Sequence, residues 1–243
     1  MRPAAKSPVL WAGLLFVFLL LDMRQLGPLF AGAFPGVQPE IFNRASFTEM
    51  FWSHLELVAL ASGAAAIVGI GLAIFVTRPA GRDFRAMVNA AATIGQTFPP
   101  AAVLALAVPA MGFGPRPTAM ALFLYGLLPI LENAIAGLEG VPNAVRDAAA
   151  GMGLSRWQLL RDVELPLAAP VILAGVRVSV TIGIGTATIG SAVGALTFGT
   201  PIFAGLAGNK LPYVIQGAVM VALFAILTDL LFARLARALT PPG

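Results

Sequence analysis

Long apolar runs recur along the chain and are separated by short polar stretches. An α-helix needs roughly 20 predominantly apolar residues to cross the hydrocarbon core of a bilayer, and each run is long enough to supply one. The pattern therefore predicts an all-α polytopic membrane protein with six transmembrane helices. The runs lie at about residues 8–27, 54–76, 86–109, 118–136, 171–196 and 213–232.

The first run is the weakest, because its unbroken apolar part covers only residues 9–21. Residues 31–33, Ala-Gly-Ala, resemble the cleavage site of a secretory signal peptide. Asp22 and Arg24 lie between that site and the apolar part, however, and the distance is longer than in a typical signal. We interpret the run as a membrane span, with cleavage after it as the alternative.

Polar residues mark the beginning and the end of the second span. Ser46 and Glu49 have the spacing of a capping box, in which each side chain accepts a hydrogen bond from the other residue's amide. This predicts a helix that begins there, continues as the span and ends at residues 77–79, Thr-Arg-Pro. A plain loop before the span is the alternative.

Two adjacent prolines interrupt the third run near its middle. Each lacks an N–H donor, and its ring clashes with the preceding turn, so we expect a kinked or broken helix. Inside a membrane the freed carbonyls need a protein or water partner, and transporters place such breaks near the substrate path. Residues of the break are candidates for lining a passage, and a purely structural kink is the equal alternative. They are Gln96, Thr97, Phe98, Pro99 and Pro100.

The fifth run is rich in glycine and in hydroxyl-bearing residues. Small residues let helices approach closely, so we interpret the glycines as packing positions. The hydroxyl groups of Thr186, Thr188 and Ser191 can instead line a polar passage. Residues 197–201, Thr-Phe-Gly-Thr-Pro, are typical of a turn. Residues 197–212 are therefore predicted to form an external loop or a shallow gate.

Composition agrees with a membrane protein and excludes several kinds of site. Hydrophobic residues make up 58% of the chain and charged residues 11%, whereas a soluble domain is about 25% charged. Cysteine is absent and His54 is the single histidine, which excludes disulfides, thiolate metal sites and multi-histidine metal sites. The pI is near 10.3, but the basic residues are dispersed along the chain, so no nucleic-acid partner is indicated.

The basic residues indicate how the chain is oriented in the membrane, because cytoplasmic loops carry an excess of Lys and Arg. With a cytoplasmic N-terminus, ten fall inside and four outside, so both termini are predicted to be cytoplasmic. Glu132 and Arg177 then lie in the cytoplasmic halves of their spans, and because charges in lipid are costly we expect them to pair. The inner residues are Arg2, Lys6, Arg78, Arg82, Arg85, Arg146, Arg156, Arg161, Arg234 and Arg237, and the outer ones are Arg24, Arg44, Arg116 and Lys210.

A charged segment, residues 137–170, separates the fourth and fifth apolar runs. Residues 142–143, Pro-Asn, suit a helix start, and residues 144–150 continue with good helix formers. Gly151 and Gly153 supply a stop. The segment is predicted to be cytoplasmic and to begin with a short helix.

A second short helix is predicted after the glycine bend. Ser155 and Gln158 form another capping box, and Pro166 should end the helix, because the residue before a proline avoids helical geometry. Trp157 and Leu160 would share one face and offer an apolar anchor to a partner. An amphipathic loop packed on the protein's own inner face is the alternative.

This segment resembles the EAA loop of permease subunits of binding-protein-dependent ABC importers. That motif runs acid-Ala-Ala, three residues, Gly, nine residues, Ile, one residue, Leu-Pro, three residues, Pro. Every spacing is met, with Asp in place of Glu and Val in place of Ile. The resemblance implies that the segment couples to a partner ATPase. The matching residues are Asp147, Ala148, Ala149, Gly153, Val163, Leu165, Pro166 and Pro170, and Trp157 joins them as the apolar anchor.

Longer stretches look like the osmoprotectant branch of that family, the glycine betaine/choline-type permeases. They include GQTFPPAAVLALAVPAMGFG and IGTATIGSAVGALTFGTPI. The resemblance implies a type I ABC importer permease fold in a bacterial cytoplasmic membrane, with residues 1–45 as an N-terminal span and external loop and residues 46–243 as the permease domain. It implies two cytoplasmic ATPase subunits, a second permease subunit of the same or a related kind, and a periplasmic or surface binding protein.

The chain lacks the residues that ATP hydrolysis requires. Its two lysines, Lys6 and Lys210, lie outside any G-x-x-x-x-G-K-[ST] phosphate loop. We therefore expect no cofactor on this chain and ATP with Mg on the partner. An ion-gradient-driven secondary transporter or channel is the alternative function, but it would need an inverted repeat and a midplane ion site, and no convincing repeat is found. An intramembrane enzyme would need paired acids at helical spacing, which the chain does not offer.

Overall fold

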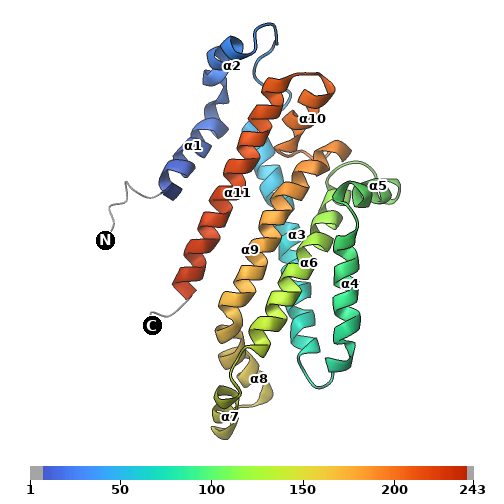
Figure 1. Cartoon of the computed structure of the whole chain (residues 1–243), viewed down its shortest axis with the longest axis vertical. Helices are drawn as coiled ribbons and strands as arrows, with labels where there is room; N and C mark the ends of the chain where they lie inside the picture. Colours follow the sequence, from blue (N-terminus) through green and yellow to red (C-terminus); the bar gives the residue numbers. More distant parts are fainter. Residues whose placement is uncertain (1–7, 240–243) are drawn as a thin grey trace. The chain divides into compact units, whose positions relative to one another are not determined.

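The computed structural model describes residues 8–239, which form helices and connecting turns without a β-strand (Figure 1). Among them, five helices are long and apolar enough to cross a membrane, and a broken pair makes a sixth if it counts as one span. The expected all-α polytopic class is confirmed, and the predicted six spans are present if the broken pair counts as one span. Arg2 and Lys6 of the orientation argument lie outside the described residues. The five spans are Val9–Ala33, Phe47–Val76, Pro115–Glu139, Arg156–Val193 and Leu211–Ala238.

The first span is longer than the sequence pattern predicted. It comprises α1 (Pro8–Asp22), a 3-10 turn η2 (Met23–Leu26) and α2 (Gly27–Ala33). Residues 31–33, the alternative cleavage site, are the last residues of α2. Pro28 lies in the first turn of α2, where its missing N–H is not needed for an intrahelical hydrogen bond.

The helix α3 (Phe47–Val76) begins at the predicted capping box. The Ser46 amide donates to Glu49 Oε2 at 2.9 Å, and the Glu49 amide donates to Ser46 Oγ at 3.1 Å. At the other end, Thr77 Oγ1 donates to the carbonyl of Ala73 at 2.8 Å and satisfies a backbone acceptor that the end of the helix leaves open. Both predicted ends of this helix are confirmed.

The third apolar run is broken at the predicted prolines. The helix α4 (Arg85–Thr97) ends before Phe98, and α5 (Pro100–Met111) begins after Pro99. Phe98 and Pro99 have extended backbones, with ψ of 136° and 141°. The reason is that a proline disfavours helical geometry in the residue before it, and two prolines in succession impose this twice.

The helix α6 (Pro115–Glu139) leads into the charged segment, where α7 (Asn143–Gly151) forms as predicted. The second helix differs from the prediction, because Pro166 does not end it. A turn of α-helix, α8 (Arg156–Gln158), is followed by a π-helical segment, η4 (Leu159–Glu164), and then directly by α9 (Leu165–Gly190). The Leu165 amide donates to the carbonyl of Leu160, five residues back. This wider turn separates the proline ring from the carbonyls with which it would clash in a regular helix.

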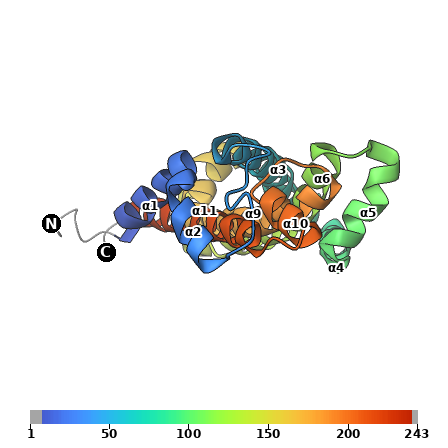
Figure 2. The same cartoon turned by 90° about the horizontal axis from the view of Figure 1, so that it is seen from above.

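Within residues 197–212, where an external loop or a shallow gate was predicted, the structure contains a helix. After a 3-10 turn, η5 (Ser191–Val193), α10 (Gly199–Ala207) precedes α11 (Leu211–Leu239) (Figures 1 and 2). Pro201 lies in the first turn of α10 and therefore removes no intrahelical hydrogen bond. A Cβ on Gly217 would lie 2.6 Å from Ile202, and one on Gly205 would lie 2.8 Å from Val214. These glycines let α10 pack closely on the first turns of α11.

The chain divides into two compact units, and α3, α6, α9 and α11 each contribute residues to both. The first unit comprises residues 1–60, 99–122 and 183–231. Its core contains the buried ring of His54, whose Nε2 lies 3.2 Å from the carbonyl of Ile184 and whose Nδ1 accepts from the Phe198 amide at 3.4 Å. Rings packed around it at centroid separations of 5.3–6.4 Å fill this core. They are Phe16, Phe51, Phe198 and Phe224, and the exposed ring of Trp52 packs on Phe51 from outside this core.

The second unit comprises residues 61–98, 123–182 and 232–243. Small and aliphatic side chains form its core and let α6 and α9 approach each other closely. A Cβ on Gly175 would lie 2.7 Å from the Pro129 carbonyl, which supports the packing interpretation of such glycines. The core residues are Ala73, Val76, Ala92, Leu131, Ala134, Ile135, Leu138, Leu160, Ala168 and Ile172.

Candidate functional site

The helix α7 is terminated by local backbone geometry at both ends. Pro142 is extended, with ψ of 137°, and begins the helix. At the other end Gly153 has a φ of +85°, the Leu154 amide donates to the Ala149 carbonyl at 3.2 Å, and the Gly153 amide donates to the Ala150 carbonyl at 2.9 Å. This is a Schellman motif, which requires a residue with positive φ. The prediction of a glycine stop is confirmed, with Gly153 as its left-handed residue.

The second capping box of the segment is also present. The Ser155 amide donates to Gln158 Oε1 at 2.9 Å, and the Gln158 amide donates to Ser155 Oγ at 3.3 Å. The helical turn that follows is therefore held at its first residue. Together with the Schellman motif, this box defines the bend between α7 and α8.

Half of the eight residues that match the EAA motif are exposed. Asp147, Ala148 and Gly153 are exposed, and no heavy atom lies within 4 Å of a Cβ built on Gly153. The indole of Trp157 is 66% exposed. Leu165 and Pro170 are half-buried, and Pro166 is exposed. The exposed members form a surface with small side chains on α7 and one large aromatic side chain on α8.

Two positions differ from the predicted docking surface. Ala149 is only 3% exposed and Leu160 only 6% exposed, because α7 packs against η4 and Leu160 belongs to the core of the second unit. Trp157 and Leu160 therefore do not share an accessible face, and the predicted apolar anchor consists of Trp157 alone. Ala149 is a packing residue between α7 and the rest of the unit.

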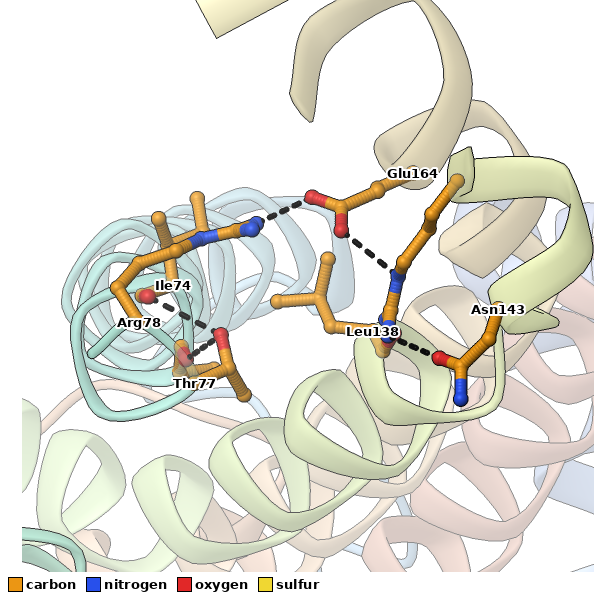
Figure 3. Close-up of polar contacts among 8 residues, drawn as sticks. Ile74, Thr77, Arg78, Leu138, Asn143 and Glu164 are labelled. Atoms are coloured by element: carbon orange, nitrogen blue, oxygen red, sulfur yellow. Dashed lines mark hydrogen bonds and ion pairs between the residues drawn. The ribbon is translucent and has the colours of Figure 1, made fainter. Parts of the chain in front are cut away.

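A buried carboxylate lies directly behind this surface. Glu164, the last residue of η4, is 2% exposed. Its Oε2 pairs with Nη2 of Arg78, which follows α3, and its Oε1 lies 3.0 Å from Nε of Arg146 on α7 (Figure 3). The Arg146 contact is an ion pair and not a directed hydrogen bond, since Nε itself has no hydrogen-bond acceptor. Arg146 also donates from Nη2 to the Leu138 carbonyl.

Charge on this carboxylate is compensated on two sides. Removing one partner of a buried ion pair costs about 3–5 kcal/mol of stability. The cost is lower here, because about a third of each arginine side chain is exposed to solvent. A cavity of about 540 Å³ adjoins the cluster and is also lined by Arg82, Arg85 and Glu139. Arg85 pairs with Glu139 at its exposed rim.

Sequence reasoning placed Arg78 and Arg146 only as orientation signals and gave Glu164 no role. The signal that was present is the position of Glu164, an acid directly before Leu165-Pro166. Its partners are 86 and 18 residues away, and no local spacing pattern connects residues at those distances. The three residues are a functional candidate that only the folded chain brings together.

At the break of the third run, Gln96 has a structural role. Its Nε2 donates to the Tyr125 carbonyl on α6 at 2.6 Å. In a regular helix that carbonyl would accept from residue 129, which is a proline without an N–H. Thr97 Oγ1 donates back to the carbonyls of Thr93 and Ile94. Phe98 and Pro99 are exposed and Pro100 is half-buried. Their lining of a passage stays a prediction.

Two of the three candidate hydroxyl groups of the fifth run, those of Thr188 and Ser191, have hydrogen-bond partners within the chain. Thr186 is 5% exposed, and Thr188 Oγ1 donates to the Ile184 carbonyl at 3.0 Å. Ser191 Oγ lies 2.7 Å from Thr197 Oγ1 and 3.3 Å from Thr200 Oγ1. This hydroxyl network joins the end of α9 to the start of α10. A passage along the Thr186, Thr188 and Ser191 side chains stays a prediction.

Glu132 is exposed on α6. Its predicted pairing with Arg177 stays a prediction. The buried acid of this unit is Glu164, which the sequence pattern did not single out.

Comparison with known proteins identifies the family. A family model described as "binding-protein-dependent transport system inner membrane component" matches residues 65–241. Osmoprotectant import permease protein OsmY of Salmonella typhimurium is 45% identical over 188 residues, which cover 77% of this chain and 80% of that protein. Glycine betaine/carnitine/choline transport system permease protein OpuCB of Bacillus subtilis is 37% identical over 190 residues, covering 78% of this chain and 86% of that protein.

A solved structure has the same fold. A chain of the MetNI methionine ABC transporter in an inward-facing conformation has a TM-score of 0.71 at 21% identity, over 80% of this chain and 96% of that chain. This likeness shows the type I importer permease fold that was expected. The family model described above matches well over half of the residues of the present chain. The chain therefore belongs to the family of binding-protein-dependent transport system inner membrane components.

Proposed function

We propose that this chain is the membrane-spanning subunit of an ATP-driven importer for glycine betaine, choline or a related quaternary-ammonium osmolyte. The observation that carries the proposal is the exposed EAA surface: Asp147, Ala148, Gly153 and Trp157 lie on the outside of two short helices whose bend is held by a Schellman motif and a capping box. The solute class is supported by the printed functions of the two relatives.

ATP hydrolysis is assigned to two partner subunits, which would hold ATP with Mg, while this chain binds no cofactor. The small exposed side chains of α7 permit close approach of an ATPase cleft. The exposed indole of Trp157 offers the large apolar contact that often dominates the binding energy of an interface. Leu165, Pro166 and Pro170 connect this surface to α9 without interrupting the helix. Ala149 contributes from beneath, by packing α7 on the unit.

The remaining assembly follows from the same proposal. A second permease subunit, identical or related, completes the passage, and a binding protein outside the membrane delivers the solute. Both termini and residues 137–170 lie in the cytoplasm, as the ten-to-four distribution of basic residues favours. Residues 1–45 supply an N-terminal span and external loop to a permease domain of residues 46–243. Gln96–Pro100 and the hydroxyl face of α9 remain the candidate lining of the passage.

The test is transport by the reconstituted complex. Vesicles that contain the permease, its ATPase and its binding protein should accumulate labelled glycine betaine or choline when ATP is inside, and not when ATP is replaced by a non-hydrolysable analogue. An imposed ion gradient without ATP should give no accumulation. Uptake driven by the gradient alone would instead establish a secondary transporter, and ATP-driven uptake of an unrelated solute would overturn the osmolyte assignment.

A further inference from the structure

The helix α7 is joined to α6 and α8 by two short links. Val141 in the preceding link is 4% exposed, and backbone hydrogen bonds to the carbonyls of Ala149 and Ala150 fix the bend that follows. Two residues of α7 add side-chain contacts to these backbone restraints. Ala149 packs against the unit, and Arg146 makes charged contacts.

Arg146 ties α7 to three other elements. It donates to the carbonyl of Leu138 at the end of α6 and pairs with Glu164, which in turn pairs with Arg78 beyond the end of α3. Glu164 is also the last residue before α9. The carboxylate therefore connects the exposed helix to the end of α3 and the start of α9, and Arg146 connects it to α6, all within the same unit (Figure 3).

We propose that Glu164 is a positioning residue that transmits displacement of α7 to α3 and α9 during ATP-driven import. This inference rests on the proposed function. When the ATPase moves α7, the Arg146–Glu164–Arg78 chain of charges pulls two spans with it, because a carboxylate that is 2% exposed loses a compensating charge when either guanidinium group moves away. Without Glu164, displacement of α7 would be transmitted only by the backbone and by apolar packing, and less of it would reach the spans.

The carboxylate belongs to a π-helical segment, and single π-helical turns within α-helices occur frequently at functional sites. A shift of η4 by one hydrogen-bond register would displace Glu164 relative to Arg146 and Arg78. The ion pairs therefore join α7 to the π-helical segment that leads into α9.

The first experiment compares two carboxylates of the same cavity. Glu164→Gln keeps the shape of the side chain but removes its charge, and Glu139→Gln removes the exposed pair with Arg85 and serves as the matched control. In the assembled importer, Glu164→Gln should retain ATPase binding and ATP hydrolysis but lower solute uptake per ATP by about tenfold, within the 5- to 150-fold range of typical coupling effects. Glu164→Asp should recover part of the loss, and Glu139→Gln should match the unaltered protein.

The second experiment measures the position of α7 directly. The chain has no cysteine, so Asp83→Cys and Ala144→Cys, both at exposed positions, can carry a pair of spin labels in the assembled importer. Glu164→Gln should widen the distribution of distances between the labels, and Glu139→Gln should leave it unchanged. If Glu164→Gln is lost from the membrane, Arg78→Gln, which leaves Arg146 on the carboxylate, should show the same changes to a smaller extent.

An unaltered distance distribution together with normal uptake per ATP in Glu164→Gln, or in Arg78→Gln where that variant replaces it, would overturn the inference. Failure of the proposed function is a different result: the unaltered complex would then show no ATP-dependent uptake of any quaternary ammonium compound. The distance measurement still decides the positioning role in that case, since it does not depend on the solute.

Discussion

Two adjacent alanines of α7 lie in opposite environments and allow docking to be separated from folding. Ala148 is exposed, whereas Ala149 is 3% exposed and packs between α7 and η4. The same substitution, alanine to leucine, adds three carbon atoms at either position. Because the environments differ, its two consequences should differ in kind.

Ala149→Leu should destabilise the permease itself. Extra methylene groups in a packed interior cost about 1–3 kcal/mol, and each kcal/mol lowers the thermal midpoint of a chain of this size by about 2–4 °C. Ala148→Leu should change stability by less than about 0.5 kcal/mol, as is usual at the surface. It would instead hold the ATPase subunit away from α7, and the same 1–3 kcal/mol applied to that interface weakens binding by about 5- to 150-fold.

The assay is a thermal stability measurement on the detergent-solubilised permease, with a pull-down of the ATPase subunit and solute uptake in vesicles. We expect a lower midpoint for Ala149→Leu, and a normal midpoint with lost ATPase binding and uptake for Ala148→Leu. Normal ATPase binding and uptake in Ala148→Leu would refute docking on α7. Equal destabilisation by both substitutions would refute the assignment of Ala148 to a free surface.

Four other predictions follow from local geometry and orientation. Gly153 has a φ of +85° and open space around it, so alanine at this position should lower stability by about 1 kcal/mol, while asparagine should be nearly neutral. Equal thermal midpoints for the two variants would contradict this. Gly199→Ala places a Cβ 2.0 Å from the Thr188 carbonyl and should cost about 3 kcal/mol, seen as loss of protein from the membrane. Gln96→Leu leaves a backbone carbonyl of α6 without its donor and should lower stability by about 1–3 kcal/mol; lost uptake at an unaltered midpoint would favour a passage-lining role. A reporter fused after Gly151 should be cytoplasmic, and an external location would defeat the proposed function.

Local hydrogen bonds made much of this structure predictable from the sequence. The capping boxes at Ser46 and Ser155, the glycine stop at Gly153 and the break at Pro99 all involve groups within about five residues of each other. Spacing in the sequence is enough to specify such contacts. Apolar run length similarly determined the number and approximate position of the spans, and the EAA spacing determined the family.

Tertiary structure alone decided which of these residues are exposed and which face the core. The sequence treats Ala148 and Ala149 alike, and periodicity placed Leu160 beside Trp157 although Leu160 is buried. Glu164 is buried and paired with Arg78, 86 residues away, although no local pattern connects the two. The physical reason is that burial and ion pairing depend on the rotation of each helix and on which chain segments meet, and these follow from packing of the whole unit, not from any local pattern.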